Sequence, residues 1–173
     1  TAQSPQQSMP ASLAKVFVAV AASDTMAIRQ ALQDGGDPNG LGFRVRDGLQ
    51  LTPLGIAVST GSIASMEVLL DAGARVNSEA SAVPPLWAAS FQCKPAATSV
   101  LIARGANVNI RRGRSGLTPL LIACQSHCSS VARLLLESGA DPHAATMDGV
   151  TPLMAAAWWG SVPVMRLLLA HDP

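Results

Sequence analysis

The chain has 173 residues, of which 49% are hydrophobic and 13% are charged, and its formal net charge is +1. A chain of this size and apolar content can bury a substantial core. The near-neutral charge excludes a polyelectrolyte role, and no apolar run reaches the roughly 18–20 residues of a membrane-spanning helix. With only three Phe, three Trp and no Tyr, the core must consist mainly of Ala, Leu and Val.

The N-terminal region begins with a polar, Pro-containing segment, residues 1–12, which is predicted to be a flexible tail. The apolar stretch 13–22, LAKVFVAVAA, has two interpretations. It resembles a short signal-peptide core, but no basic residue precedes it, which favours the first helix of a two-helix unit. The second helix is expected over 25–33, with Ile28 and Leu32 facing inward.

A two-helix pattern recurs along the remaining chain at a spacing of about 33 residues. In its most regular copy, Thr118 can cap a helix that begins at Pro119, and Gly139 can end a second helix. The start of the pattern recurs at Thr52-Pro53-Leu54, Pro84-Pro85-Leu86 and Thr151-Pro152-Leu153, and its stop recurs at Gly73-Ala74 and Gly105-Ala106. Over residues 47–173 the chain therefore resembles the ankyrin repeat family.

This resemblance implies an all-α ankyrin solenoid, in which stacked helix–turn–helix units carry projecting β-hairpin or loop fingers. About five repeats are expected, at approximately 13–39, 40–77, 78–109, 110–143 and 144–173. The first lacks the Thr-Pro-Leu start, and the last ends in an apolar helix without a polar capping unit. Because arrays usually cover such a face, we expect further repeats or domains after residue 173, or a partner at this end.

The resemblance also implies a non-enzymatic module for protein–protein interaction, with a scaffold role. A partner protein or peptide would lie in a concave groove between the fingers and the first helices. Trp158 and Trp159 occupy positions where sister repeats carry Ser-Thr or Gln-Ser, and Trp and Arg often dominate interface energies. The alternative is that one Trp packs on the second helix or on an absent downstream repeat. The other candidate partner-binding residues are Phe91, Gln92, Gln125, Arg44, Arg46, Arg111, Arg112, Arg114 and Met147.

The three cysteines, Cys93, Cys124 and Cys128, are odd in number and unevenly spaced. This argues against a disulfide framework and predicts a reducing compartment, cytoplasmic or nuclear. Cys124, His127 and Cys128 have a spacing that could present metal ligands on one helix face, but the paired C-x-x-C pattern is missing. We expect Cys124 to be core packing and His127 to lie in the inter-helix turn, with no metal or cofactor.

No catalytic motif is found among those that carry nucleophiles, metals or phosphate-binding glycines, so the segment is predicted not to be an enzyme. Two alternatives stay open. The array could be a targeting or regulatory segment of a longer enzyme, or its basic fingers could contact nucleic acid or anionic lipid. The arginines at 111–114 lack interleaved aromatic residues for base stacking, which favours a protein partner with an acidic patch.

The sequence departs from the family at the residue after the Pro-Leu start, which is often His. Here the residues are Gly55, Trp87, Leu121 and Met154. The hydrogen bonds that such a His would make between neighbouring repeats are therefore expected to be absent. The family sometimes carries hydroxylated asparagine at positions that correspond to Asn77 and Asn109.

Overall fold

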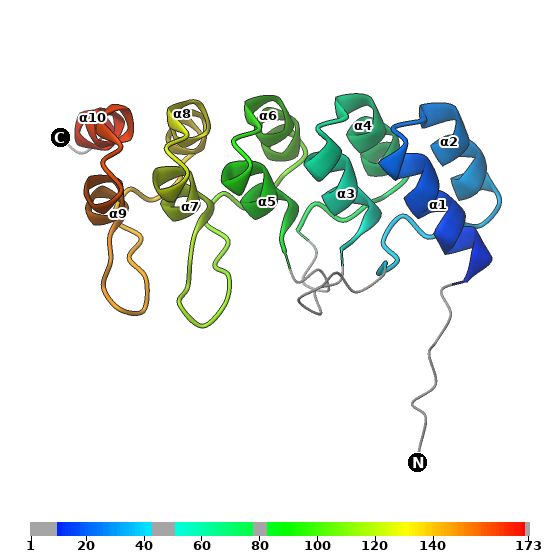
Figure 1. The fold of residues 1–173 in the computed structure, drawn as a ribbon, viewed down its shortest axis with the longest axis horizontal. Helices are drawn as coiled ribbons and strands as arrows, with labels where there is room; N and C mark the ends of the chain where they lie inside the picture. The colour runs from blue at the N-terminus through cyan, green and yellow to red at the C-terminus, as the bar shows by residue number, and fades with distance from the viewer. Residues whose placement is uncertain (1–9, 43–50, 78–82, 172–173) are drawn as a thin grey trace, which may run out of the picture.

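The computed structural model describes residues 10–42, 51–77 and 83–171. In these ranges the chain forms five successive helix pairs, and Figure 1 shows them side by side in one row, with first helices in one layer and second helices in the other. The all-α solenoid expected from the sequence is confirmed. The helices are α1 (Ala11–Ala21), α2 (Thr25–Gln33), α3 (Pro53–Thr60), α4 (Ile63–Asp71), α5 (Pro85–Phe91), α6 (Pro95–Ala103), α7 (Pro119–Gln125), α8 (Ser129–Glu137), α9 (Pro152–Trp158) and α10 (Val162–His171).

Helix α1 begins two residues earlier than the start predicted for the array. Pro10 precedes it, and Ala11 is a strong helix former, so the helix extends back into the segment predicted to be a tail. Helix α2 spans the predicted residues 25–33, with Ile28 buried and Leu32 partly buried against the core.

The Thr-Pro pairs start the first helices as expected. The hydroxyl of Thr52 accepts a hydrogen bond from the Gly55 amide at 3.2 Å, and Thr118 and Thr151 make the same capping bond. Proline follows at the first helical position, where the missing N–H would have no helical partner. In the third repeat, Pro84 replaces the threonine, and the helix starts without a side-chain cap.

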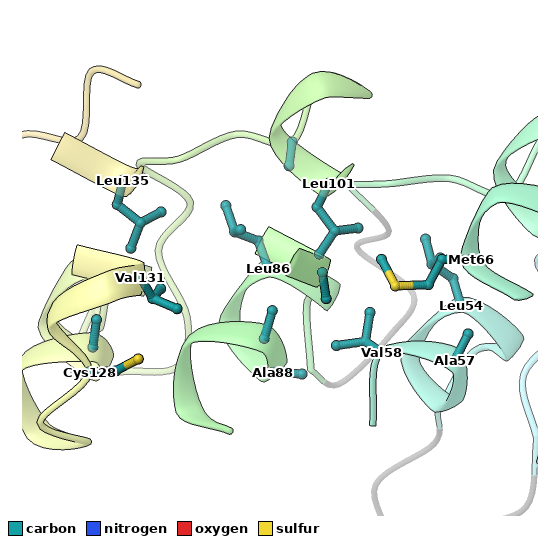
Figure 2. Close-up of a cluster of buried hydrophobic side chains, with 14 of the residues drawn as sticks. Leu54, Ala57, Val58, Met66, Leu86, Ala88, Leu101, Cys128, Val131 and Leu135 are labelled. Atoms are coloured by element: carbon teal, nitrogen blue, oxygen red, sulfur yellow. The ribbon is translucent and has the colours of Figure 1, made fainter. Parts of the chain in front are cut away.

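The core lies between the two layers and continues from repeat to repeat. Six of its leucines occupy the same register in successive repeats, and none of these six is more than 2% exposed. Figure 2 shows side chains from both layers converging on this core. Each repeat thus covers the apolar face of its neighbour, so its stability depends on stacking. These leucines are Leu54, Leu86 and Leu120 in the first helices, and Leu69, Leu101 and Leu135 in the second helices.

A ladder of asparagines joins consecutive repeats at the turn after the second helix. The side-chain amide of Asn77 donates to the Gly105 carbonyl at 2.9 Å and accepts from the Asn107 backbone N–H at 2.9 Å. One side chain therefore satisfies a backbone donor and a backbone acceptor of the next repeat. The same pair of bonds connects Asn39 to Gly73 and Arg75, and Asn109 to Gly139 and Asp141.

Replacement of Asn77 by alanine should lower the free energy of unfolding by about 1–3 kcal/mol, because two hydrogen bonds are lost at about 0.5–1.5 kcal/mol each. Urea unfolding followed by circular dichroism would measure the loss. Asn107→Ala is the matched control, since its side chain accepts a local bond from the Asn109 backbone N–H and makes no bond to the next repeat among the described residues. Equal destabilisation by the two substitutions would contradict a stabilising role for the ladder.

Candidate functional site

The ends of the first helices form a row of surface positions, which we call the helix-end row. It consists of the pairs Ser59-Thr60, Phe91-Gln92, Gln125-Ser126 and Trp158-Trp159, at the C-terminal ends of α3, α5, α7 and α9. Three of its members are large aromatic residues, and their side chains face solvent. Trp158 is 85% exposed, Phe91 60% and Trp159 51%. Residues Ser59, Thr60 and Gln92 are also exposed, whereas Gln125 and Ser126 are half-buried.

A hydrogen bond connects the first two pairs of the helix-end row. The amide of Gln92 donates to the hydroxyl oxygen of Ser59 at 3.1 Å, and that hydroxyl donates to the Gly55 carbonyl at 3.0 Å. Gln92 is therefore oriented by the preceding repeat.

An aromatic and cationic stack lies beside Phe91. The Trp87 ring, one helical turn earlier on α5, stacks on Phe91 with centroids 5.6 Å apart, and the Arg112 guanidinium carbon lies 4.5 Å from the Trp87 centroid. Arg112 comes from the loop at 110–117, which an antiparallel bridge between Arg112 and Leu117 closes. The cation–π contact thus holds this loop of the fourth repeat against the third repeat.

Trp87 was not among the candidate residues, although the sequence singled it out as a departure from the usual His. The aromatic pair Trp87 and Phe91 has i, i+4 spacing, which places both rings on one helix face and could have indicated the stack. The contact from Arg112 gave no sequence signal. It joins residues 25 positions apart, and their proximity depends on how the repeats stack.

Arg111 and Met147 connect the loop at 110–117 to the loop that precedes α9. The guanidinium of Arg111 donates to the Ala145 carbonyl at 2.9 Å, and the Met147 backbone N–H donates to the Ser115 carbonyl at 2.9 Å. Arg111 therefore has a role within the molecule, in holding two loops together. The Met147 side chain itself is 76% exposed.

The remaining predicted positions divide into two groups. Arg114 is exposed within the loop at 110–117, and Gln125 is half-buried at the end of α7. Arg44 and Arg46 lie outside the described residues. Phe91, Arg112 and Arg114 thus lie on or beside the third and fourth repeats, and the tryptophan pair lies on the fifth.

The cysteines correct one expectation from the sequence. Cys93 and Cys128 form a disulfide, with Cα atoms 5.5 Å apart and 35 positions between them in the chain. Stacking brings together the inter-helix turn of the third repeat and the start of α8, which spacing in the sequence does not reveal. The number and spacing of the cysteines therefore no longer support the predicted cytoplasmic or nuclear location, which stays a prediction. Cys124 is buried as expected, which raises the pKa of its thiol to about 12, and His127 lies in the inter-helix turn.

The described residues contain no cluster of metal-ligating side chains, and a small pocket lies away from the helix-end row. No group of three His, Cys, Asp or Glu side chains in residues 10–42, 51–77 and 83–171 could hold a metal ion. None of the helices in these ranges is long and apolar enough to cross a membrane. One pocket of about 80 Å³ is lined by Pro142, His143, Thr151, Leu153, Leu168 and Leu169. It is smaller than the roughly 300–1,000 Å³ of typical ligand clefts and includes no residue of the helix-end row.

Comparison with known proteins gives a consistent result. The family described as ankyrin repeats, three copies, matches residues 85–173. The chain is 35% identical over 113 residues to the Ankyrin repeat and KH domain-containing protein mask-1 of Caenorhabditis elegans, covering 65% of this chain and 4% of that protein. It is 33% identical to the Ankyrin repeat, SAM and basic leucine zipper domain-containing protein 1 of Dasypus novemcinctus, covering 66% of this chain and 25% of that protein.

The human Transient receptor potential cation channel subfamily A member 1 is also similar, at 33% identity over 68% of this chain and 11% of the channel. The chain therefore spans a quarter or less of the length of each of these relatives. Two of these relatives are named for ankyrin repeats, and the third is named as a cation channel.

Proposed function

The chain belongs to the ankyrin repeat family, a non-enzymatic fold that generally binds other proteins, and on this premise we propose that it binds an extended partner segment along the helix-end row. One observation carries the proposal: the row presents exposed aromatic rings in the third and fifth repeats, where the second and fourth carry small or polar residues. An aromatic side chain can bury about 150–250 Å² at an interface, so exposed rings at ordered positions are suited to be anchors.

The register supports this interpretation over a missing downstream repeat. Phe91 occupies the position of Trp158 and is 60% exposed, although the fourth repeat stacks beside it. A neighbouring repeat thus leaves this position open. By contrast, Leu121 and Leu136 are buried, whereas Met154 and Leu169, at the same positions in the fifth repeat, are each 58% exposed. A further repeat, which we propose as the occupant of that face, would cover Met154 and Leu169 and leave the ring of Trp158 accessible.

The spacing of the aromatic anchors sets the expected form of the partner. Phe91 and Trp158 are separated by α7, and neighbouring helices pack at about 8–10 Å, which puts the rings roughly 16–20 Å apart. An extended peptide rises about 3.3 Å per residue, so its two anchoring side chains would be about five or six residues apart. Between the anchors the row presents Gln125 and Ser126, which favour a polar stretch of the partner.

The charges beside this stretch favour an acidic partner. Arg112 is held on Trp87, and Arg114 is exposed on the same loop. Guanidinium groups bind carboxylates through charge-assisted hydrogen bonds and steer acidic partners during association. We therefore propose a partner segment with two large apolar side chains and acidic residues between them. Arg111 acts mainly in holding the two loops together. A contribution of Arg44 and Arg46 to partner binding stays a prediction.

A fluorescein-labelled peptide in which two tryptophans flank five residues, each glutamate or serine, would test this proposal by fluorescence anisotropy. We call it the tryptophan–glutamate peptide. Arg112→Ala should weaken its binding about tenfold, because a hydrogen bond to a charged group contributes about 1.5–3 kcal/mol. Arg133→Ala is the matched control, since Arg133 is exposed on α8, in the other helix layer.

The controls separate the alternatives. A peptide with lysines in place of the glutamates should bind at least about tenfold more weakly. Equal effects of the two arginine substitutions, or equal binding of both peptides, would contradict the proposed surface. Tighter binding of a mixed-sequence single-stranded RNA, with a steep loss of affinity in salt, would instead favour nucleic acid as the partner.

A further inference from the structure

The disulfide lies directly beside the proposed binding surface. Cys93 is an exposed residue in the turn between α5 and α6, and it immediately follows Phe91 and Gln92. Cys128 immediately precedes α8, and only 1% of it is exposed. Figure 2 shows Cys128 at the edge of the core between neighbouring repeats. The bond therefore joins the third and fourth repeats next to Phe91-Gln92 and Gln125-Ser126, the two pairs that these repeats contribute to the helix-end row.

The position of the bond follows from the stacking of the array. One repeat earlier, the Lys94 ammonium nitrogen is 3.3 Å from where a Cβ on Gly61 would be, which is the same turn-to-helix-start relation. The turn residue has a positive φ in every repeat, and non-glycine residues adopt this conformation rarely. Cysteine at this position has a local conformational cost that the covalent bond can offset. The turn residues are Ser23, Gly61, Cys93, His127 and Gly160.

We propose that the Cys93–Cys128 bond is a redox-controlled cross-link of the binding surface, closed under oxidising conditions and opened by a dithiol reductant. The inference rests on the proposed function of the helix-end row. When closed, the bond fixes Phe91-Gln92 relative to Gln125-Ser126. When it is open, the turn after α5 can move relative to the fourth repeat.

The chemistry of opening is ordinary thiol–disulfide exchange. A thiolate of the dithiol attacks the sulfur of Cys93, the exposed residue of the pair, and forms a mixed disulfide, while the Cys128 sulfur leaves with the electron pair and takes up a proton. The second thiolate of the reductant then attacks the reductant's own sulfur in the mixed disulfide and releases the Cys93 thiol. Two electrons pass to the protein, which gains two thiols, and the reductant becomes a disulfide. Oxidation by a disulfide compound reverses these steps.

The surroundings of the bond make opening a local event. Cys124 is fully buried and its thiol stays protonated at neutral pH, so it does not compete in the exchange. The Cys128 sulfur lies 3.4 Å from the Ser130 hydroxyl, which provides a polar partner for the released thiol. The buried leucines Leu101 and Leu135 still hold the second-helix layer together. Reduction should therefore loosen the surface without unfolding the array.

Experiments on the full 173-residue chain, purified without reductant, would test the proposed cross-link directly. Alkylation by iodoacetamide in denaturant followed by mass spectrometry should modify one cysteine before treatment with dithiothreitol and all three afterwards. The thermal midpoint should fall by about 5–10 °C on reduction, as expected when a loop of this length loses its cross-link. Backbone amides at 87–93 should exchange hydrogen about tenfold faster.

Two variants serve as controls. The double variant Cys93→Ser/Cys128→Ser should behave like the reduced protein and should not respond to dithiothreitol, whereas Cys124→Ala should keep the response. Three reactive thiols before reduction would overturn the proposal. So would unchanged amide exchange after complete reduction.

Binding of the tryptophan–glutamate peptide separates this inference from the proposed function. Its affinity should fall by about threefold or more on reduction, because ordering a loosened surface lowers affinity. Failure of the peptide to bind in either redox state would refute the proposed partner chemistry. The thiol count and amide exchange would still decide whether the redox-controlled cross-link exists. Equal binding in both states, with a confirmed bond, would show that the bond does not control the surface.

Discussion

Replacement of both Trp158 and Trp159 by alanine should reduce binding of the tryptophan–glutamate peptide by more than about 30-fold, while the helices stay intact. An aromatic hot spot often contributes about 2 kcal/mol or more, which corresponds to about 30-fold in affinity. Both side chains face solvent at the end of α9, so their removal leaves no cavity in the core. Fluorescence anisotropy would measure binding, and far-UV circular dichroism would measure helix content.

Met26→Ala is the matched control for the tryptophan pair. Met26 is 74% exposed on α2, in the other helix layer, and its removal should change neither binding nor stability. If the double tryptophan variant instead unfolds at a lower temperature than Met26→Ala, the rings are structural, and the helix-end row loses its strongest anchors.

Leu101→Ala should destabilise the array more than any surface substitution discussed above. Leu101 is fully buried in α6, within the continuous core. Removal of a buried leucine side chain typically costs about 2–5 kcal/mol, since apolar contacts are lost and a cavity remains. Because each repeat is stabilised by its neighbours, damage in the third repeat should also make the two ends of the array unfold at different urea concentrations.

Urea unfolding observed by two methods would detect this separation. Tryptophan fluorescence reports the third and fifth repeats, where Trp87, Trp158 and Trp159 lie, and circular dichroism reports all helices. The control is Leu169→Ala, which should cost less than about 1 kcal/mol because Leu169 is 58% exposed. Coincident transitions with equal destabilisation in the two variants would contradict the proposed coupling between repeats.

The sequence by itself determined the repeat architecture, because the signals are local. Thr118 and Pro119 start a helix through a side-chain cap and a missing N–H, and both effects act within four residues. The 33-residue recurrence then identified the family and the stacked helix pairs. The burial of Cys124 and the turn position of His127 also followed from their register against sister repeats.

Only the tertiary structure decided which side chains meet between repeats. The asparagine ladder, the stack of Arg112 on Trp87 and the Cys93–Cys128 bond all join residues 25 or more positions apart. Their geometry depends on the angle and distance at which successive repeats pack, which periodicity does not specify. For this reason the sequence identified Arg111 and Arg112 as binding residues of one kind. In the structure Arg111 joins two loops, whereas Arg112 lies on an aromatic ring at the surface.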